Sequence, residues 1–234
     1  MRPPRQKAGR AKRRFKMRIK YLGHACFLLE ANDGTRILTD PYEPGSFDGA
    51  VKYRPVAETA DIVLVSHDHA DHNWSAGIPG SPQVIKEDGE RAVSGIKVLG
   101  VPSFHDTSRG SERGNNIIFR VELDGLAVCH LGDLGHALDP ASASALLPVD
   151  VLLMPVGGTF TIGAQVASEV MEILSPTLTI PMHFKTDGVD FPIDPVDGFL
   201  AKKDNVIRAG SSEITVSRGD IPSGIVLLDP SLLP

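Results

Sequence analysis

The stretch VLVSHDHADH, residues 63–72, ends an apolar run with three histidines and two aspartates within six positions. A loop that follows a buried strand is held rigidly, while its side chains are free to face a common point. Because His67 and His69 are two residues apart, an extended chain would direct both imidazoles the same way. Asp71 and His72, after a turn, can face a second point. The stretch therefore predicts a metal site whose loop could serve two ions.

The types of donor in this loop indicate which metals it suits. Neutral imidazole and carboxylate groups suit Zn, Fe, Ni or Mn, whereas a Ca site would need more oxygen ligands and a structural Zn site would usually contain thiolates. Cys26 and Cys129 lie in apolar segments without metal-type spacing, so we expect two reduced core residues. Two ligand sets of this kind indicate catalysis, and they disfavour the alternative of a merely solvated polar loop.

The composition predicts one domain with an unusual N-terminus. At 234 residues and 41% hydrophobic, the chain can bury one core, which we expect to span residues 17–234. The first 20 residues hold ten Lys or Arg and no acidic residue, leaving 14 basic against 29 acidic residues, a net charge of −15, in the rest. Because a patterned strand, MRIKYL, opens at Met17, we expect residues 1–16 to be a disordered or non-native extension. Neither a membrane span nor a secretory signal is recognisable, which predicts a cytoplasmic protein.

Strand-like runs dominate the first half of the chain, and helices alternate with strands in the second. The expected strands are residues 17–22, 25–30, 35–39, 61–66, 96–101, 115–123, 126–131, 150–155 and 177–182. The expected helices are residues 140–147, 163–174 and 195–202. The buried stripe expected for the middle helix is Ile162, Val166, Val170, Ile173 and Leu174. Runs such as DIVLVS and VDVLLMPV look buried on both faces, which predicts a sheet core covered by helices.

Three further metal-type residues end apolar runs: His105 in VPSFHD, Asp133 in CHLGDLG and His183 in IPMHF. Taken singly, each is more often structural than a ligand. Together with the first motif, however, they form the ordered series SHDHADH, SFHD, HLGD and PMHF, which resembles the metallo-β-lactamase superfamily. The resemblance covers about residues 17–208. It implies an α/β fold, a four-layer αββα sandwich with a metal cleft at one edge.

Within that superfamily, the chain is similar to small metal-dependent hydrolases related to ascorbate-6-phosphate lactonases. The likeness rests on GHACFLLE (23–30), RGNNIIF (113–119), HLGDLGH (130–136), PVGGTFTI (155–162) and IPMHFKT (180–186). Redox members of the superfamily carry Glu where this chain has His69, and they generally need a flavin domain. Both differences favour hydrolysis.

The resemblance implies a binuclear centre of two divalent ions per chain, with Zn as the first expectation and Mn or Fe as alternatives. One ion would be held by three histidines, the other by an aspartate and two histidines, and one further aspartate would bridge them. These sets are His67, His69 and His105; Asp71, His72 and His183; and Asp133. The resemblance also places Asp40, in ILTDPY, behind the ligands, and we expect His24 and His130 to orient ligands in the same way.

Two cations that share a water lower its pKa from about 16 toward about 7, so such a centre would supply a metal-bridging hydroxide at neutral pH. We expect hydrolysis of a small ester, lactone or phosphoester, with Asp71 and Asp133 as the catalytic carboxylates. The expected substrate contacts are the polar residues beside the motifs: Arg109, Arg113, Asn115, Thr159, Thr161 and Lys185. Positive charge among them would suit an anionic substrate, although ordinary solvated charge explains Arg109 and Arg113 equally well.

Two other functions stay open at this point. The basic extension could tether a metal-dependent phosphodiesterase or nuclease to nucleic acid, but the acidic remainder of the chain disfavours that partner. A non-catalytic metal-binding protein is the second alternative, and the complete ligand set disfavours it. True β-lactamase activity does not follow from the fold. We therefore expect a small-molecule substrate and no membrane partner, and a homo-oligomer is possible.

Overall fold

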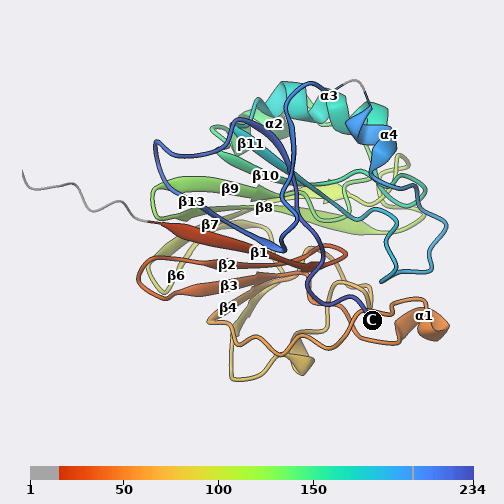
Figure 1. Cartoon of the computed structure of the whole chain (residues 1–234). Coiled ribbons are helices and arrows are strands. Elements are labelled where there is room, and N and C mark those ends of the chain that lie inside the picture. Colours follow the sequence, from red (N-terminus) through yellow and green to blue (C-terminus); the bar gives the residue numbers. More distant parts are fainter. Residues whose placement is uncertain (1–15, 202) are drawn as a thin grey trace, which may run out of the picture.

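The structure, a computed structural model, describes residues 16–201 and 203–234, so the expected extension over residues 1–16 lies outside the described residues apart from Lys16. Two β-sheets pack face to face, and three helices cover the outer side of one of them (Figure 1). This is the expected sandwich of sheets and helices. Among the helices of the described residues, none is long and apolar enough to cross a membrane.

The smaller sheet has six strands in the order β13-β1-β2-β3-β4-β5. Their bounds are β1 Met17–Gly23, β2 Cys26–Glu30, β3 Arg36–Thr39, β4 Ile62–Leu64, β5 Gln83–Ile85 and β13 Glu213–Val216. The larger sheet has eight strands in the order β12-β14-β11-β10-β9-β8-β7-β6. Their bounds are β6 Gly89–Val93, β7 Ile96–Phe104, β8 Asn115–Leu123, β9 Leu126–His130, β10 Val151–Pro155, β11 Leu178–Met182, β12 Val206–Arg208 and β14 Gly224–Leu227.

The nine strands expected from the sequence are all present, and five more were not expected. These are β5, β6, β12, β13 and β14, of which the first four are the edge strands of the two sheets. Edge strands pair on one side only and carry exposed positions, so they lack the apolar run by which a central strand is recognised.

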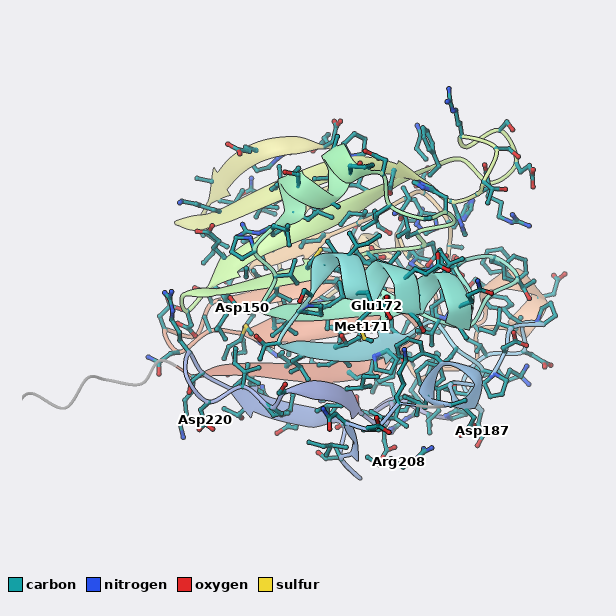
Figure 2. The ribbon with its side chains drawn as sticks, turned by 90° about the horizontal axis from the view of Figure 1, so that it is seen from above. Asp150, Met171, Glu172, Asp187, Arg208 and Asp220 are labelled. Atoms are coloured by element: carbon teal, nitrogen blue, oxygen red, sulfur yellow. The ribbon has the colours of Figure 1, made fainter. Side chains whose placement is uncertain are left out.

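Three helices lie against the eight-stranded sheet: α2 Pro140–Leu146, α3 Ala164–Leu174 and α4 Asp197–Leu200. Seen from above, α3, labelled at Met171 and Glu172, lies over this sheet (Figure 2). Its buried residues are Ala167, Val170 and Leu174, spaced three and four apart as one helical face requires. The prediction that Ile173 belongs to this stripe is wrong. It is 46% exposed, because successive residues of a helix differ by about 100° around its axis and Ile173 therefore points away from the face that contains Leu174.

The central strands of the six-stranded sheet are buried on both faces. Along β2, for example, Phe27 and Leu29 belong to the core between the sheets, while Cys26 and Leu28 face a second apolar cluster on the outer side. That cluster is completed by residues of connecting segments, such as Tyr42, Tyr53, Val56, Ile78, Val189 and Ile193. The fourth layer therefore consists of connecting segments, which include only the single turns α1 Ser46–Gly49 and η1 Ser75–Gly77 among the described residues. In an αββα sandwich, helices are expected in this layer.

Parallel strands determine where the polar motifs meet. Strands β3, β4 and β5 run parallel in one sheet, and β9, β10, β11 and β14 run parallel in the other. The carboxyl ends of parallel strands meet at one edge of a sheet, and loops there are free to carry functional groups. The motifs that contain Asp40, His67, Asp133 and His183 all begin just after such an end.

We expect the two neighbouring apolar residues at the end of α3 to differ in their effect on stability. Leu174→Ala removes a fully buried side chain and should lower the free energy of unfolding by about 2–5 kcal/mol. Ile173→Ala removes an exposed side chain and should change it by less than about 0.5 kcal/mol. Urea unfolding followed by circular dichroism measures both values, and equal losses would contradict the observed helix face.

Candidate metal centre

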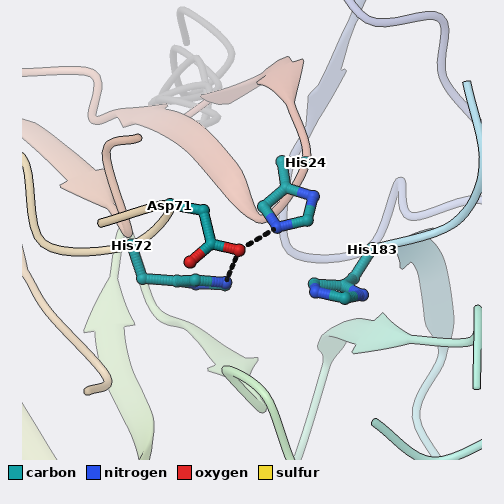
Figure 3. Close-up of side chains that lie close together, drawn as sticks. All are labelled: His24, Asp71, His72 and His183. Atoms are coloured by element: carbon teal, nitrogen blue, oxygen red, sulfur yellow. Dashed lines mark hydrogen bonds and ion pairs between the residues drawn. The ribbon is translucent and has the colours of Figure 1, made fainter. Parts of the chain in front are cut away.

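Two groups of metal-type side chains lie close together at this edge. His67, His69 and His105 form the first group, and one nitrogen from each lies within 4.8 Å of the others. The second group, to the same limit, consists of His24, Asp71, His72 and His183 (Figure 3). Each of the two ligand triplets that the resemblance implies is therefore brought together in space. His24, which was expected to orient ligands and not to bind metal, lies in the second group.

Asp133 lies between the two groups. Its Oδ2 is 3.2 Å from Nε2 of His105 in the first group, and 3.2 Å and 3.3 Å from Nε2 of His72 and His183 in the second. It is 3.9 Å from Nε2 of His67. A carboxylate in this position faces both groups at once, as a bridging ligand must.

The backbone around Asp133 is held by Asn116, which the sequence analysis did not single out, and by His130, which it did. The backbone N–H of Asp133 donates to Oδ1 of Asn116 at 2.9 Å. His130 donates from Nε2 to the carbonyl of Ala25 at 2.9 Å and accepts from the N–H of Gly132 at 3.1 Å. The expected role of His130 behind the ligands thus takes the form of bonds to backbone, which fix the turn that carries Asp133.

Asp40 orients one histidine of each group. Its Oδ2 accepts from Nδ1 of His72 at 3.0 Å and from Oγ of Ser66 at 2.6 Å. Because the single Ser66 hydroxyl proton is used in this way, Ser66 Oγ must accept from Nδ1 of His67, 2.9 Å away. Both imidazoles therefore carry their proton on Nδ1 and direct Nε2 toward the centre. Supporting carboxylates fix metal-binding histidines in the same manner.

His24 has a comparable relation to Asp71. Its Nε2 donates to Oδ2 of Asp71 at 3.0 Å, and its backbone carbonyl accepts from the N–H of His183 at 2.9 Å. Both His24 and His183 have left-handed backbone angles, with φ of 56° and 49°. Non-glycine residues adopt this conformation rarely and at an energetic cost, so the surrounding structure must impose it. The hydrogen bond from His183 to His24 joins the end of β11 to the turn after β1.

Burial and charge leave several histidines neutral. Burial, reinforced by neighbouring histidines, lowers the pKa of His67 to about 3 and that of His24 to about 4. Neutral imidazole has a free lone pair, which is the form that binds metals. Burial alone would lower the pKa of His72, but the carboxylates of Asp133 and Asp71 raise it well above its usual value.

The carboxylates of the centre carry excess negative charge. Burial alone would raise the pKa of Asp133, but His183 and His72 hold it well below its usual range. In the described part of the chain, the ion-pair partners of Asp40, Asp71 and Asp133 are histidines, without a lysine or arginine among them. Buried charges in proteins are paired or coordinate metals. The centre therefore has the charge that divalent cations would balance.

Unpaired polar atoms point to the same conclusion. Buried side-chain atoms without a hydrogen-bond partner include Nε2 of His67 and His72 and Oδ1 of Asp133. Such atoms are rare in native proteins and call for an explanation such as an ion. The donor set, nitrogen and carboxylate oxygen, also fits Zn, Mn or Fe.

The carboxylate of Asp106, outside the two donor groups, organises the loop that follows His105. Asp106 is buried and accepts four backbone N–H groups, those of Ser108, Gly110, Glu112 and Arg113, at 2.7–3.1 Å. These bonds lower the pKa of Asp106 to about 2, although desolvation opposes the shift. The loop is folded around this one side chain, which thereby fixes the backbone of Arg113.

A pocket of about 290 Å³ opens over the centre. Its lining comprises five metal-type residues, three phenylalanines and one arginine: His69, Asp71, His105, Asp133, His183, Phe47, Phe160, Phe191 and Arg113. Arg113 was an expected substrate contact, and it is the one of the six that lines this pocket. The phenylalanines were not singled out: nothing in the sequence ties GSFDG or DFPID to the metal motifs, and in PVGGTFTI only the threonines on either side of Phe160 were expected to contact substrate.

The other expected substrate contacts lie elsewhere. Asn115 lines a neighbouring groove beside His67 and His69. Arg109 is exposed, and the Oγ1 of the buried Thr161 donates to the carbonyl of Ile162. Thr159 and Lys185 hold the segment of Phe191: Thr159 Oγ1 donates to the carbonyl of Pro192 at 2.7 Å, and Lys185 Nζ donates to that of Phe191 at 3.0 Å.

Comparison with known proteins identifies the family of the chain. Residues 18–183 match the β-lactamase superfamily domain. A protein of Thermococcus kodakarensis named a UPF0173 metal-dependent hydrolase is 33% identical over 195 residues, 73% of this chain and 85% of the relative. A crystal structure from Thermotoga maritima, described as that of a Zn-dependent hydrolase of the metallo-β-lactamase superfamily, is 40% identical with a TM-score of 0.76, covering 91% of this chain and 98% of that one. The short form of human tRNase Z, 14% identical with a TM-score of 0.53 over 73% of this chain and 93% of that one, shares the fold alone.

Fold and site thus define a two-sheet sandwich with a metal-type centre at one edge. The chain belongs to the metallo-β-lactamase superfamily, which confirms the expected family and fold. Its relatives are named metal-dependent hydrolases, in agreement with the expected class of enzyme. The narrower likeness to ascorbate-6-phosphate lactonases is not addressed by these relatives and stays a prediction.

Substitution of Asp106 should give a stability change that depends on pH. Asp106→Asn keeps one acceptor oxygen for the four N–H groups, so the variant should be less stable than the parent at pH 7. A carboxyl whose pKa falls from 3.8 to about 2 on folding stabilises the protein above pH 3.8 and loses that contribution as pH falls toward 2. Urea unfolding at pH 7, 4 and 3 should therefore show a gap between parent and variant that narrows in acid. A gap independent of pH would contradict the role of Asp106.

Proposed function

We propose that the protein is a binuclear metal-dependent hydrolase that cleaves a small ester, lactone or phosphoester. The observation that carries this proposal is the position of Asp133, whose Oδ2 lies within 3.3 Å of His105 in one donor group and of His72 and His183 in the other. One ion would bind His67, His69 and His105, and the second Asp71, His72 and His183, with Asp133 between them. Zn is the proposed metal, and Mn or Fe would suit the same donors.

The chemistry that two such ions supply is activation of water as a nucleophile and polarisation of the attacked carbonyl or phosphoryl oxygen. The protein's own groups hold this arrangement in place. Asp40 fixes the tautomers of His67 and His72, and His24 fixes the carboxylate of Asp71. Asp133 has an unpaired buried oxygen, Oδ1, at which it can accept a proton when the nucleophile attacks.

Arg113 supports an anionic substrate. It lines the pocket together with the metal-type residues, and its neighbouring carboxylate, Glu112, is 3.7 Å away. A guanidinium at this distance keeps much of its capacity for a second anion, and its planar shape suits a carboxylate or phosphate. The proposed partner is therefore a small anionic molecule.

The decisive experiment measures metal content and turnover together. Protein purified without chelator should contain about two metal ions per chain by elemental analysis, and it should hydrolyse a generic phosphodiester or lactone in a chelator-sensitive manner. Absence of metal after reconstitution would refute the centre. Turnover confined to nucleic-acid phosphodiesters, with a steep decrease in salt, would favour a nuclease instead.

Removal of either central carboxylate should abolish turnover without unfolding the protein. Asp71→Ala and Asp133→Ala each remove a proposed metal ligand, so we expect kcat to fall more than about 100-fold, beyond the effect typical of residues behind the ligands. Circular dichroism checks the fold. Rates near those of the parent in both variants, with metal still bound, would contradict the assignment.

Asp40 should control metal affinity without touching the metal. Asp40→Asn replaces the carboxylate that accepts from His72 and Ser66, and it should weaken metal binding about 10- to 100-fold. Competition with a chromophoric chelator measures the affinity. Asp68→Asn is the matched control, since this exposed carboxylate in the same loop contacts Asn73 instead. Equal losses in the two variants would indicate a general effect of charge.

A further inference from the structure

Three phenylalanine rings form one continuous wall of the pocket over the centre. The rings of Phe47 and Phe191 have centroids 5.5 Å apart in an edge-to-face arrangement, and those of Phe191 and Phe160 are 6.0 Å apart in the same arrangement. The guanidinium of Arg113 lies over the ring of Phe160 at 5.8 Å. We call Phe47, Phe160 and Phe191 the aromatic wall. It comes from three separate segments of the chain, so their meeting is a feature of the fold.

The backbone at Phe47 holds the ring in this position. Phe47 and Asp48 both have left-handed angles, with φ of 54° and 55°, between Gly45 and Gly49. Gly45 N–H donates to the carbonyl of Val51 at 2.8 Å, which closes the turn. A bulky residue with positive φ is uncommon and costs energy, and such residues gather at ligand-binding sites. The turn therefore keeps an apolar ring at the pocket although its backbone would favour a small residue.

Phe47 is also unusually accessible for its type, at 50% exposure. Ile173 and Ile207 are similarly exposed, yet neither lines the pocket over the centre. Single exposed apolar residues need no explanation, but an apolar group of side chains around a polar centre is typical of a ligand site. At about 290 Å³, the pocket has room for a small group beside the centre.

We propose that the aromatic wall binds an apolar aryl or acyl group of the substrate while the anionic group that is attacked lies at the metal centre and Arg113. This inference rests on the proposed function and narrows its substrate class. Edge-to-face packing favours a planar ring or a short hydrocarbon chain. A polyhydroxylated substrate is disfavoured, because its hydroxyls would be buried against rings that offer no hydrogen bond.

The test compares two phosphonates that share an anionic head. Benzylphosphonate carries a ring that can reach the aromatic wall, whereas methylphosphonate does not. With protein supplied with Zn, isothermal titration calorimetry should show benzylphosphonate binding about tenfold tighter or better. Phe47→Ala should remove most of this preference and leave the Kd of methylphosphonate unchanged. Because the side chain is half exposed, the variant should fold, which circular dichroism checks.

Ile173→Ala is the matched control, since it truncates an apolar side chain of similar exposure on α3 and should keep the full preference. Equal affinity for the two phosphonates, a preference unaffected by Phe47→Ala, or binding of neither compound would overturn the aromatic wall as a substrate site. Failure of the proposed function looks different. If the protein prefers benzylphosphonate but hydrolyses no aryl ester or phosphoester, the aromatic wall stands as a binding site and the proposed hydrolase function is wrong. Chelator-sensitive turnover without the preference would retain the hydrolase alone.

Discussion

The carboxylate of Asp40 is the constraint on which the rest of the site depends. It is fully buried at the end of β3, and it accepts from the backbone and hydroxyl of Ser66 and from the ring of His72. A buried carboxylate is stable only when its oxygens are hydrogen-bonded, so these bonds lock the ends of β3 and β4 together. They also decide which nitrogen of His67 and His72 is free. The donor atom of one histidine in each group is therefore determined by a carboxylate that lies outside the two groups.

Charge balance extends this argument from geometry to chemistry. Asp40, Asp71 and Asp133 are buried, and their ion-pair partners among the described residues are imidazoles. Burial lowers the pKa of His67 and His24, so these two rings add no positive charge at neutral pH, whereas Asp133 and Asp71 raise the pKa of His72 against the effect of burial. Three buried carboxylates without a lysine or arginine partner among the described residues are costly by themselves. The arrangement becomes favourable when divalent cations are bound, which couples metal binding to the stability of this edge of the fold.

The sequence could predict which metal-type side chains lie together because each one follows an apolar strand and has a distinctive type. His67, His69, Asp71 and His72 form one motif, and parallel strand ends bring the more distant ligands to the same edge. Partners defined by neutral hydrogen bonds carry no such signal. Asn116, in the interior of the expected strand 115–123, looked like any polar residue, although it positions the backbone of Asp133. For Asp106, the sequence indicates only that a carboxylate follows His105. Its four bonds to backbone N–H groups depend on the path of the loop, which no sequence pattern specifies. The edge strands were not predicted, and Ile173 was wrongly predicted to be buried. In both cases the reason is that hydrophobic periodicity indicates burial only where one face of an element is covered along its whole length.

Two of the residues expected to contact substrate, Thr159 and Lys185, instead help to fix the distance between the metal-type centre and the aromatic wall. Thr159 and Lys185 hold the segment of Phe191, and a ring of backbone bonds closes behind it. Gly157 N–H donates to His183 at 3.1 Å, Asp194 N–H to Gly157 at 2.7 Å, and Lys185 N–H to Asp194 at 2.9 Å. A side chain at Gly157 would collide with the carbonyl of His183, so this frame requires glycine there. The segment that begins at a proposed metal ligand thus carries a pocket ring eight residues later within one rigid frame. A fixed separation between these two points is the condition under which a site can select substrates by the length of their apolar group.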